Sequence, residues 1–156
     1  MGKCGAACAL VLLSGPAFAA CAPGEADLRW PGGAARFSVE IADTPALRET
    51  GLMNRDKLAR SAGMLFSYAA PEHAYYWMKN TLIPLDIIFA NQGGTVTRVA
   101  SNAVPGDLTP IDGGAGVAYV LEINGGLAAR LGIAPGAELR AQAMAQDGLA
   151  WPCAAN

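Results

Sequence analysis

The sequence predicts a mainly β protein, a single antiparallel β sandwich or barrel-like domain with two short helices. Six or seven short stretches have the pattern of strands, and only two segments carry helix boundaries. The strands and helices do not alternate regularly, as a parallel sheet would require. The 156 residues are 53% hydrophobic and 15% charged, which suits one globular domain and excludes a disordered chain.

The N-terminus has the pattern of a secretory signal peptide. Lys3 precedes an apolar stretch of about ten residues, and the small residues Ala17 and Ala19 match an ordinary cleavage site. The stretch is shorter than the roughly 20 apolar residues of a membrane span. We therefore expect a periplasmic or otherwise exported protein. Its expected parts are a signal peptide (1–19), an N-terminal segment (20–35), a β-rich domain (36–144) and a C-terminal tail (145–156).

The cysteines allow two interpretations of the mature N-terminus. Cys4 and Cys8 leave with the signal peptide, so Cys21 and Cys153 remain. In an oxidising compartment two cysteines permit one pairing, and a disulfide between them is the favoured expectation. The alternative is a lipoprotein, in which Cys21 carries a lipid and attaches the protein to a membrane. Phe18 disfavours it, because bacterial lipobox sites usually have an aliphatic residue at that position.

The first elements follow from local patterns. Residues 36–41 alternate between apolar and polar side chains, which is the period of a half-buried strand. An N-cap followed by proline, Thr44-Pro45, and a stop at Gly51 predict a short helix over residues 45–50.

The later elements rest on turns and breaks. Pro71 divides two aromatic-rich runs, and Asn91-Gln92-Gly93-Gly94 marks a hairpin turn. In order, we expect strands at 63–68, 74–80, 85–90 and 95–100, an irregular loop at 102–116, a strand at 117–123, a helix at 124–131 and a strand at 138–144.

Two acidic residues stand inside apolar strands, Asp86 within residues 83–89 and Glu122 within residues 117–123. A buried charge costs about several kcal/mol unless it is paired, so each carboxylate needs a nearby donor. The cations in comparable context are Lys79, Arg48 and Arg55.

A charged cluster follows as a hypothesis, in which Asp86 and Glu122 are held by Lys79 and Arg55. Asn80 and Thr81 would add hydrogen bonds. One interpretation is a buried structural ion-pair network, which needs no catalysis. The other is a functional site, where two carboxylates in one pocket could act as acid and base on a glycosidic bond.

The aromatic run beside this cluster suggests a binding surface. On an alternating strand Tyr75, Trp77 and Lys79 share one face, and Tyr76, Met78 and Asn80 share the other. Aromatic faces beside polar side chains are common parts of sugar-binding surfaces. The alternative is core packing, and at least one aromatic pair is expected to be buried.

Metal, cofactor and nucleic-acid sites are not expected. The only histidine, His73, is interpreted as a surface loop residue, and no cluster has metal-ligand spacing. Met53, Met64 and Met78 are interpreted as core residues rather than ligands of a soft ion. Without Lys3 the basic residues number 11 − 1 = 10 against 13 acids, which argues against binding to nucleic acid.

Four blocks of the chain carry a family pattern. They are Arg48-x-x-Gly51-Leu52-Met53-x-Arg55, Gly63-Met64-Leu65-Phe66, Trp77-Met78-Lys79-Asn80-Thr81-x-Ile83-Pro84-Leu85-Asp86-Ile87-Ile88-Phe89 and Val120-Leu121-Glu122-Ile123-x-x-Gly126. The chain resembles the bacterial and archaeal family called "domain of unknown function 192" over residues 37–139. The resemblance implies a mainly β, often exported protein of no established activity. Its shared blocks include Arg55, Trp77, Lys79, Asn80, Thr81, Asp86 and Glu122.

From these residues we predict a small exported β domain that binds a polar ligand such as an envelope saccharide. The predicted ligand-binding residues are Arg55, Trp77, Lys79, Asn80, Thr81, Asp86 and Glu122. One alternative is a hydrolase that uses the paired carboxylates. Another is a periplasmic interaction or assembly protein, for which an exposed apolar patch is needed.

Overall fold

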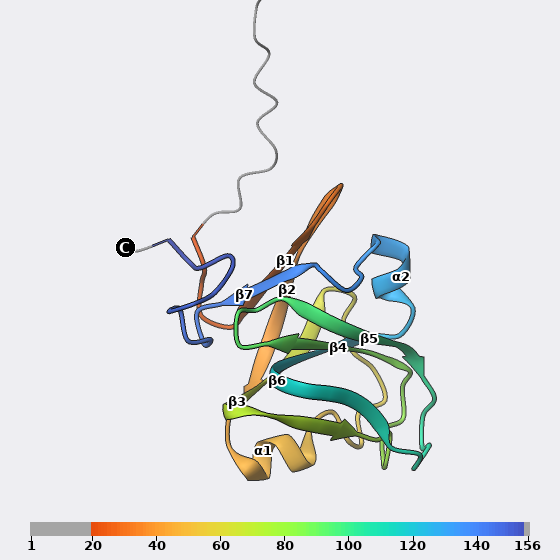
Figure 1. The fold of residues 1–156 in the computed structure, drawn as a ribbon. Coiled ribbons are helices and arrows are strands. Elements are labelled where there is room, and N and C mark those ends of the chain that lie inside the picture. Colours follow the sequence, from red (N-terminus) through yellow and green to blue (C-terminus); the bar gives the residue numbers. More distant parts are fainter. Residues whose placement is uncertain (1–19, 155–156) are drawn as a thin grey trace, which may run out of the picture.

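A computed structural model describes residues 20–154, which form one curled seven-stranded sheet and two short helices (Figure 1). The mainly β fold class is confirmed. The predicted signal peptide, with Cys4 and Cys8, lies outside the described residues. The elements are β1 (Glu25–Trp30), β2 (Gly33–Ala42), α1 (Pro45–Thr50), β3 (Ala62–Tyr76), β4 (Leu85–Asn91), β5 (Val96–Ala103), β6 (Ile111–Asn124), α2 (Leu127–Leu131) and β7 (Glu138–Ala141).

The strand order is β5-β4-β6-β3-β2-β1-β7. All neighbouring strands are antiparallel except β2 and β3, which run parallel because the chain crosses over through α1. This parallel pair was not predicted. Helix α1 begins as expected, with the Thr44 hydroxyl accepting a hydrogen bond from the Leu47 amide at 3.3 Å and Pro45 in the first turn.

The two edges of the sheet meet at one end. Thr95 pairs with Glu138 of β7, and the Val96 amide donates to the Ala137 carbonyl at 2.8 Å. Gly94 makes this approach possible, because a Cβ there would collide with the main chain of β7 and its φ of 75° disfavours other residues. The curl therefore confirms the barrel-like expectation, and it shields the edges of β5 and β7 where they meet.

Both faces of the sheet are apolar at its centre, where β4 is buried along its length from Leu85 to Ala90. Ile88 and Ala90 belong to one cluster, and Ile87 and Phe89 belong to the other. The second cluster also holds residues of β3 and β6 and of the segments that follow α1 and β3: Met64, Phe66, Val120, Leu52 and Met78. Successive residues of β4 therefore point to opposite faces of the sheet and pack in different apolar clusters.

Several predicted boundaries were wrong. The strands predicted at 63–68 and 74–80 are one strand, β3, with register shifts between Ser67 and Tyr75, and residues 77–80 lie outside it. The predicted loop at 102–116 shrinks to residues 104–110, because β5 and β6 both extend into it. His73 lies on β3 rather than in a loop, exposed and bonded to Asp112.

The ends of the described chain are joined. Cys21 and Cys153 form the predicted disulfide, with a Cα–Cα distance of 5.6 Å and a sequence separation of 132. Strand β1 lies between β2 and β7, so the sheet already begins inside the expected N-terminal segment.

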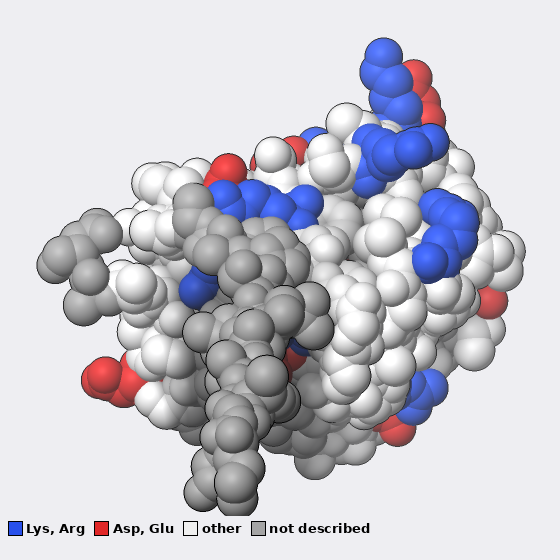
Figure 2. All heavy atoms as spheres, turned by 90° about the horizontal axis from the view of Figure 1, so that it is seen from above, with Lys and Arg blue, Asp and Glu red and all other residues white. Residues whose placement is uncertain are grey.

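On the face shown in Figure 2, neither basic nor acidic side chains cover a continuous area of the described surface. Figure 2 shows a face on which Lys and Arg side chains form separate groups, some of them beside Asp or Glu. Within residues 20–154, no helix has the length and apolar character needed to cross a membrane.

Candidate functional site

Glu122 occupies the centre of the sheet, on β6. Its register partners are Met64 on β3 and Ile87 on β4, and directly opposed residues point to the same face of a sheet. Glu122 therefore lies among the second apolar cluster, and it is only 5% exposed.

The carboxyl group of Glu122 has no hydrogen-bond or ion-pair partner among residues 20–154. Burial raises the pKa of this carboxyl from 4.5 to about 8, because an apolar environment disfavours the charged form. At neutral pH the group is mostly protonated, and it can both donate and accept a hydrogen bond.

A small pocket leads to this carboxyl from the surface. Its volume is about 40 Å³, close to the roughly 30 Å³ that one water molecule occupies in the liquid. The buried part is lined by Leu52, Phe66, Thr81 and Glu122, and the exposed part by Glu49, Thr50 and Trp77. The pocket can admit one functional group, and the rest of a ligand would lie on the rim.

Arg48 supplies a fixed cation on the pocket wall. One terminal nitrogen donates to the carbonyl oxygens of Asp43 at 2.8 Å and Ser67 at 2.9 Å. The guanidinium lies over the Tyr68 ring, 5.0 Å from its centroid. Among the described residues no carboxylate pairs with Arg48, so its guanidinium is held by main-chain oxygens and the Tyr68 ring.

Two tyrosines form a rigid wall beside it. The hydroxyl groups of Tyr68 and Tyr76 are 3.0 Å apart. The Tyr76 ring packs edge-on against Phe66 and Phe89, with centroid distances of 5.4 and 5.6 Å. Burial raises the pKa of both tyrosines, most strongly that of Tyr76, so both stay neutral.

Asp86 points away from this pocket. It is opposite Ile123, the neighbour of Glu122, so the two acids lie on opposite faces of the sheet. Its carboxylate accepts main-chain hydrogen bonds from Asn102 at 2.6 Å, Gly126 at 2.8 Å and Ala128 at 2.6 Å. Asp86 holds the start of α2 and the end of β5 in place. The predicted pairing with Glu122 was wrong, and a mechanism that uses both carboxylates has no geometric basis.

The predicted cations also have other roles. Arg55 forms a bidentate pair with Glu40, at 2.5 and 2.7 Å, which raises the pKa of Arg55 and lowers that of Glu40. The ammonium of Lys79 lies 5.0 Å from the centroid of Trp77. The proposed cluster around Lys79 and Arg55 was therefore wrong.

Of the two remaining predicted residues, Thr81 lines the pocket and Asn80 does not. Asn80 has a φ of 54° and directs its amide to the Met53 sulfur at 4.0 Å. Thr81 is buried in the pocket, and its hydroxyl donates to the Lys79 carbonyl at 3.3 Å. The structure thus brings Trp77, Thr81 and Glu122 together, and it separates Arg55 and Asp86 from them.

The predicted split of the aromatic run is confirmed from Tyr75 to Lys79 but not at Asn80, which is exposed although it was expected on the face of Tyr76 and Met78. Tyr75 is 60% exposed and Trp77 is 48% exposed, whereas Met78 is buried and Tyr76 is largely so. Sequence reasoning missed Arg48 and Tyr76 as pocket residues. The family pattern could have indicated Arg48, because one of its blocks contains Arg48 and Gly51. The search for buried charges did not select that block.

Comparisons with known proteins agree with this fold. The model of the domain of unknown function 192 family (DUF192), described as "Uncharacterized ACR", matches residues 28–141. A crystal structure of a protein of unknown function from Novosphingobium aromaticivorans DSM 12444 is 45% identical, with a TM-score of 0.73 over 74% of this chain and 83% of the other. A structure titled as a putative transcription regulator from Sinorhizobium meliloti 1021 is 38% identical, with a TM-score of 0.69 over 80% and 97%. No curated protein matches.

Proposed function

This protein belongs to the domain of unknown function 192 family, whose description assigns no activity, and we propose that it is an exported protein that binds a saccharide through the Glu122 pocket. One observation carries the proposal: a buried carboxyl with no partner among the described residues faces a pocket that opens beside an exposed tryptophan. The Glu122 side chain lines the pocket, so its carboxyl can form a hydrogen bond with a ligand group that enters there.

The pocket fits a single hydroxyl group. Its volume of about 40 Å³ excludes a whole ring, and a protonated carboxyl can donate to and accept from a hydroxyl at the same time. The Thr81 hydroxyl and the Arg48 guanidinium line the same pocket and can add a second contact. A hydroxyl or hydroxymethyl group of a sugar is the right size to reach Glu122.

The rim fits the rest of such a ligand. Trp77 presents about half of its side-chain surface to solvent, and indole faces pack against the C–H faces of sugar rings. The contact between Lys79 and Trp77 restrains the indole, which lowers the entropy lost when a ligand stacks on it.

The cysteines support export. A disulfide between Cys21 and Cys153 is typical of oxidising compartments such as the periplasm. Expression of the full chain in a bacterial host, followed by mass measurement of the periplasmic protein, tests this. We expect a chain that starts at Ala20, carries no lipid and has lost the two hydrogens of a disulfide. A precursor retained in the cytoplasm, or a lipid on Cys21, would overturn this part of the proposal.

Binding is tested with purified protein and a panel of envelope saccharides, including peptidoglycan fragments, by calorimetry. We expect one or more of them to bind, and Trp77→Ala and Glu122→Met to weaken binding by about tenfold or more, as expected for one lost hydrogen bond or stacking contact. Glu122→Gln should bind better than Glu122→Met, because an amide still donates and accepts. Tyr75→Ala is the matched control, since Tyr75 is exposed beside Trp77 but does not line the pocket. No binding across the panel, or equal binding by Glu122→Met and wild type, would sink the proposal.

A further inference from the structure

We propose that the saccharide bound at the Glu122 pocket is an acidic one, and that Arg48 binds its carboxylate. This inference rests on the proposed function and names the class of sugar: a uronic acid, or a sugar that carries a lactyl ether. It depends on the position and the free donors of Arg48, which lines the pocket together with Glu122 and Thr81.

Arg48 is fixed between α1 and β3. It belongs to α1, and its Nη1 atom donates to the carbonyl oxygen of Asp43, before the helix, at 2.8 Å and to that of Ser67 on β3 at 2.9 Å. The guanidinium carbon lies 5.0 Å from the centroid of the Tyr68 ring, also on β3. A side chain that is already held in place loses less entropy when a ligand binds to it.

One edge of the Arg48 guanidinium stays available for a ligand. The Nη1 atom carries two hydrogens and donates two hydrogen bonds. The Nε and Nη2 atoms donate to no described residue, and no described carboxylate pairs with Arg48. Neighbouring N–H groups on one edge of a guanidinium can bind a carboxylate through two parallel hydrogen bonds. Arg48 therefore has the charge and the donors for one carboxylate.

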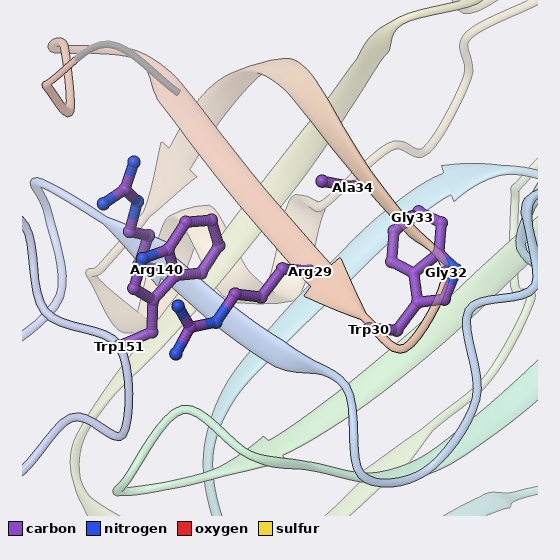
Figure 3. A pocket seen from close by; sticks show the side chains of 7 residues that line it. All are labelled: Arg29, Trp30, Gly32, Gly33, Ala34, Arg140 and Trp151. Atoms are coloured by element: carbon purple, nitrogen blue, oxygen red, sulfur yellow. The ribbon is translucent and has the colours of Figure 1, made fainter. Parts of the chain in front are cut away.

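The other described arginines do not combine these properties. In a larger cavity, of about 500 Å³, Arg29 and Arg140 lie beside Trp151 (Figure 3), but both already form ion pairs with carboxylates and lie over the Trp151 ring. Arg36 and Arg55 are also paired with acids. Three further arginines form no ion pair with a described residue and are exposed: Arg60, Arg98 and Arg130.

One sugar can contact both Arg48 and Glu122. Burial raises the pKa of Tyr68 and Tyr76, Glu122 raises it further and Arg48 opposes the rise, so the two groups lie near the same pair of tyrosines. In a uronic acid the carboxylate stands beside ring hydroxyl groups. A hydroxyl can therefore bind the protonated carboxyl of Glu122 while the carboxylate binds Arg48.

Glu49 determines how such a ligand is oriented. It is exposed, and it lines the outer part of the same pocket. Its negative charge repels a carboxylate at the rim, so the acidic group of the sugar should lie on Arg48 and away from Glu49. Glu49→Gln should therefore bind an acidic sugar at least as tightly as the wild type does.

Calorimetry with matched sugars tests the inference. The members of each pair differ by an acidic group: glucuronate against glucose, galacturonate against galactose, and N-acetylmuramic acid against N-acetylglucosamine. We expect at least one acidic sugar to bind about ten times more tightly than its neutral partner, the gain expected for one charge-assisted hydrogen bond. Lactate, which has a hydroxyl and a carboxylate but no sugar ring, should bind more weakly than that acidic sugar.

Variants assign the preference to Arg48. Arg48→Gln should bind acidic and neutral sugars equally, with the neutral sugar bound about as well as by the wild type. Arg48→Lys keeps the charge but not the paired donors, so it should keep part of the preference, and it replaces Arg48→Gln if circular dichroism shows that the latter does not fold. Arg98→Gln, which removes an exposed arginine on β5, is the matched control and should keep the full preference.

The outcomes separate this inference from the proposed function. Equal binding of acidic and neutral sugars by the wild type, or a full preference in folded Arg48→Gln, would overturn the role of Arg48 and leave saccharide binding standing. Lactate bound as tightly as the acidic sugar would overturn the assignment to a saccharide. Absence of binding by every sugar would overturn the proposed function together with this inference.

Discussion

The burial of Glu122 predicts that the folded protein loses stability as the pH rises through the neutral range. The folded state holds the carboxyl proton up to a pKa of about 8, whereas the ordinary pKa of glutamate is 4.5. Between these values the folded state binds more protons than the unfolded state, so the free energy of unfolding falls with pH. The contribution is fully present below the unfolded pKa and is lost as the pH rises through the folded pKa. At 1.36 kcal/mol per pKa unit the whole interval is worth about 5 kcal/mol, of which about 3–4 kcal/mol falls between about pH 5 and pH 8.

Urea unfolding with the disulfide intact measures this effect. Glu122→Gln keeps the shape of the side chain and cannot ionise, so other titrating groups cancel in the difference between the two proteins. We expect that difference to shift by about 3 kcal/mol in favour of the variant from about pH 5 to pH 8. Glu72→Gln, which removes an exposed carboxyl on β3, is the control for the loss of one carboxyl. A constant difference between wild type and Glu122→Gln would refute the reasoning, because it would mean that the carboxyl is not isolated from water and charge.

Three further predictions concern stability. Asp86→Asn should lower the free energy of unfolding by about 3 kcal/mol, because an amide group replaces an acceptor for buried main-chain N–H groups such as that of Ala128; urea unfolding at neutral pH measures it. Cys21→Ser with Cys153→Ser should lower it by up to about 5 kcal/mol, the chain-entropy value for so long a loop, and a loss below about 1 kcal/mol would contradict that model. Gly63→Ala should lower the melting temperature, because the new Cβ would lie 2.5 Å from a main-chain oxygen of β6, and an unchanged melting temperature would show that β3 can shift.

The parts of the fold that could be predicted depend on neighbours in sequence. The cap at Thr44, the stop at Gly51 and the turn between β4 and β5 are local, and they lie where they were expected. The parallel pairing of β2 and β3 could not be predicted, because it depends on how the crossover through α1 packs. Pro71 suggested a break, yet β3 passes through it, since the register shift between Ser67 and Glu72 provides a position where proline is tolerated.

For the candidate site, the sequence predicted which acids are buried but not which way they point. The cost of burying a charge identified Asp86 and Glu122 correctly as buried acids. Their orientation depends on the register of β4 against β6, where Asp86 faces Ile123 and Ile87 faces Glu122. A shift of one residue exchanges the faces of a strand, and nothing in the sequence fixes that register. The sequence therefore could not say whether the two acids share a pocket.

The fold explains the burial of Asp86 but not that of Glu122. Three main-chain N–H groups use the carboxylate of Asp86, so its burial is explained within the chain, and its removal should only destabilise. Among the described residues nothing uses the carboxyl of Glu122. Burying a polar group without a partner costs free energy, so an apolar side chain of similar volume at this position should be neutral or stabilising.

Glu122→Met should therefore unfold at the same or a higher urea concentration than wild type at about pH 8, where the native carboxyl is half ionised. The same variant should lose the proposed saccharide binding. A stable protein that no longer binds would mean that Glu122 serves the ligand at the expense of the fold. A variant that is strongly destabilised at every pH would mean instead that the Glu122 side chain stabilises the packing of β6. Its burial would then be explained by the fold and not by a ligand.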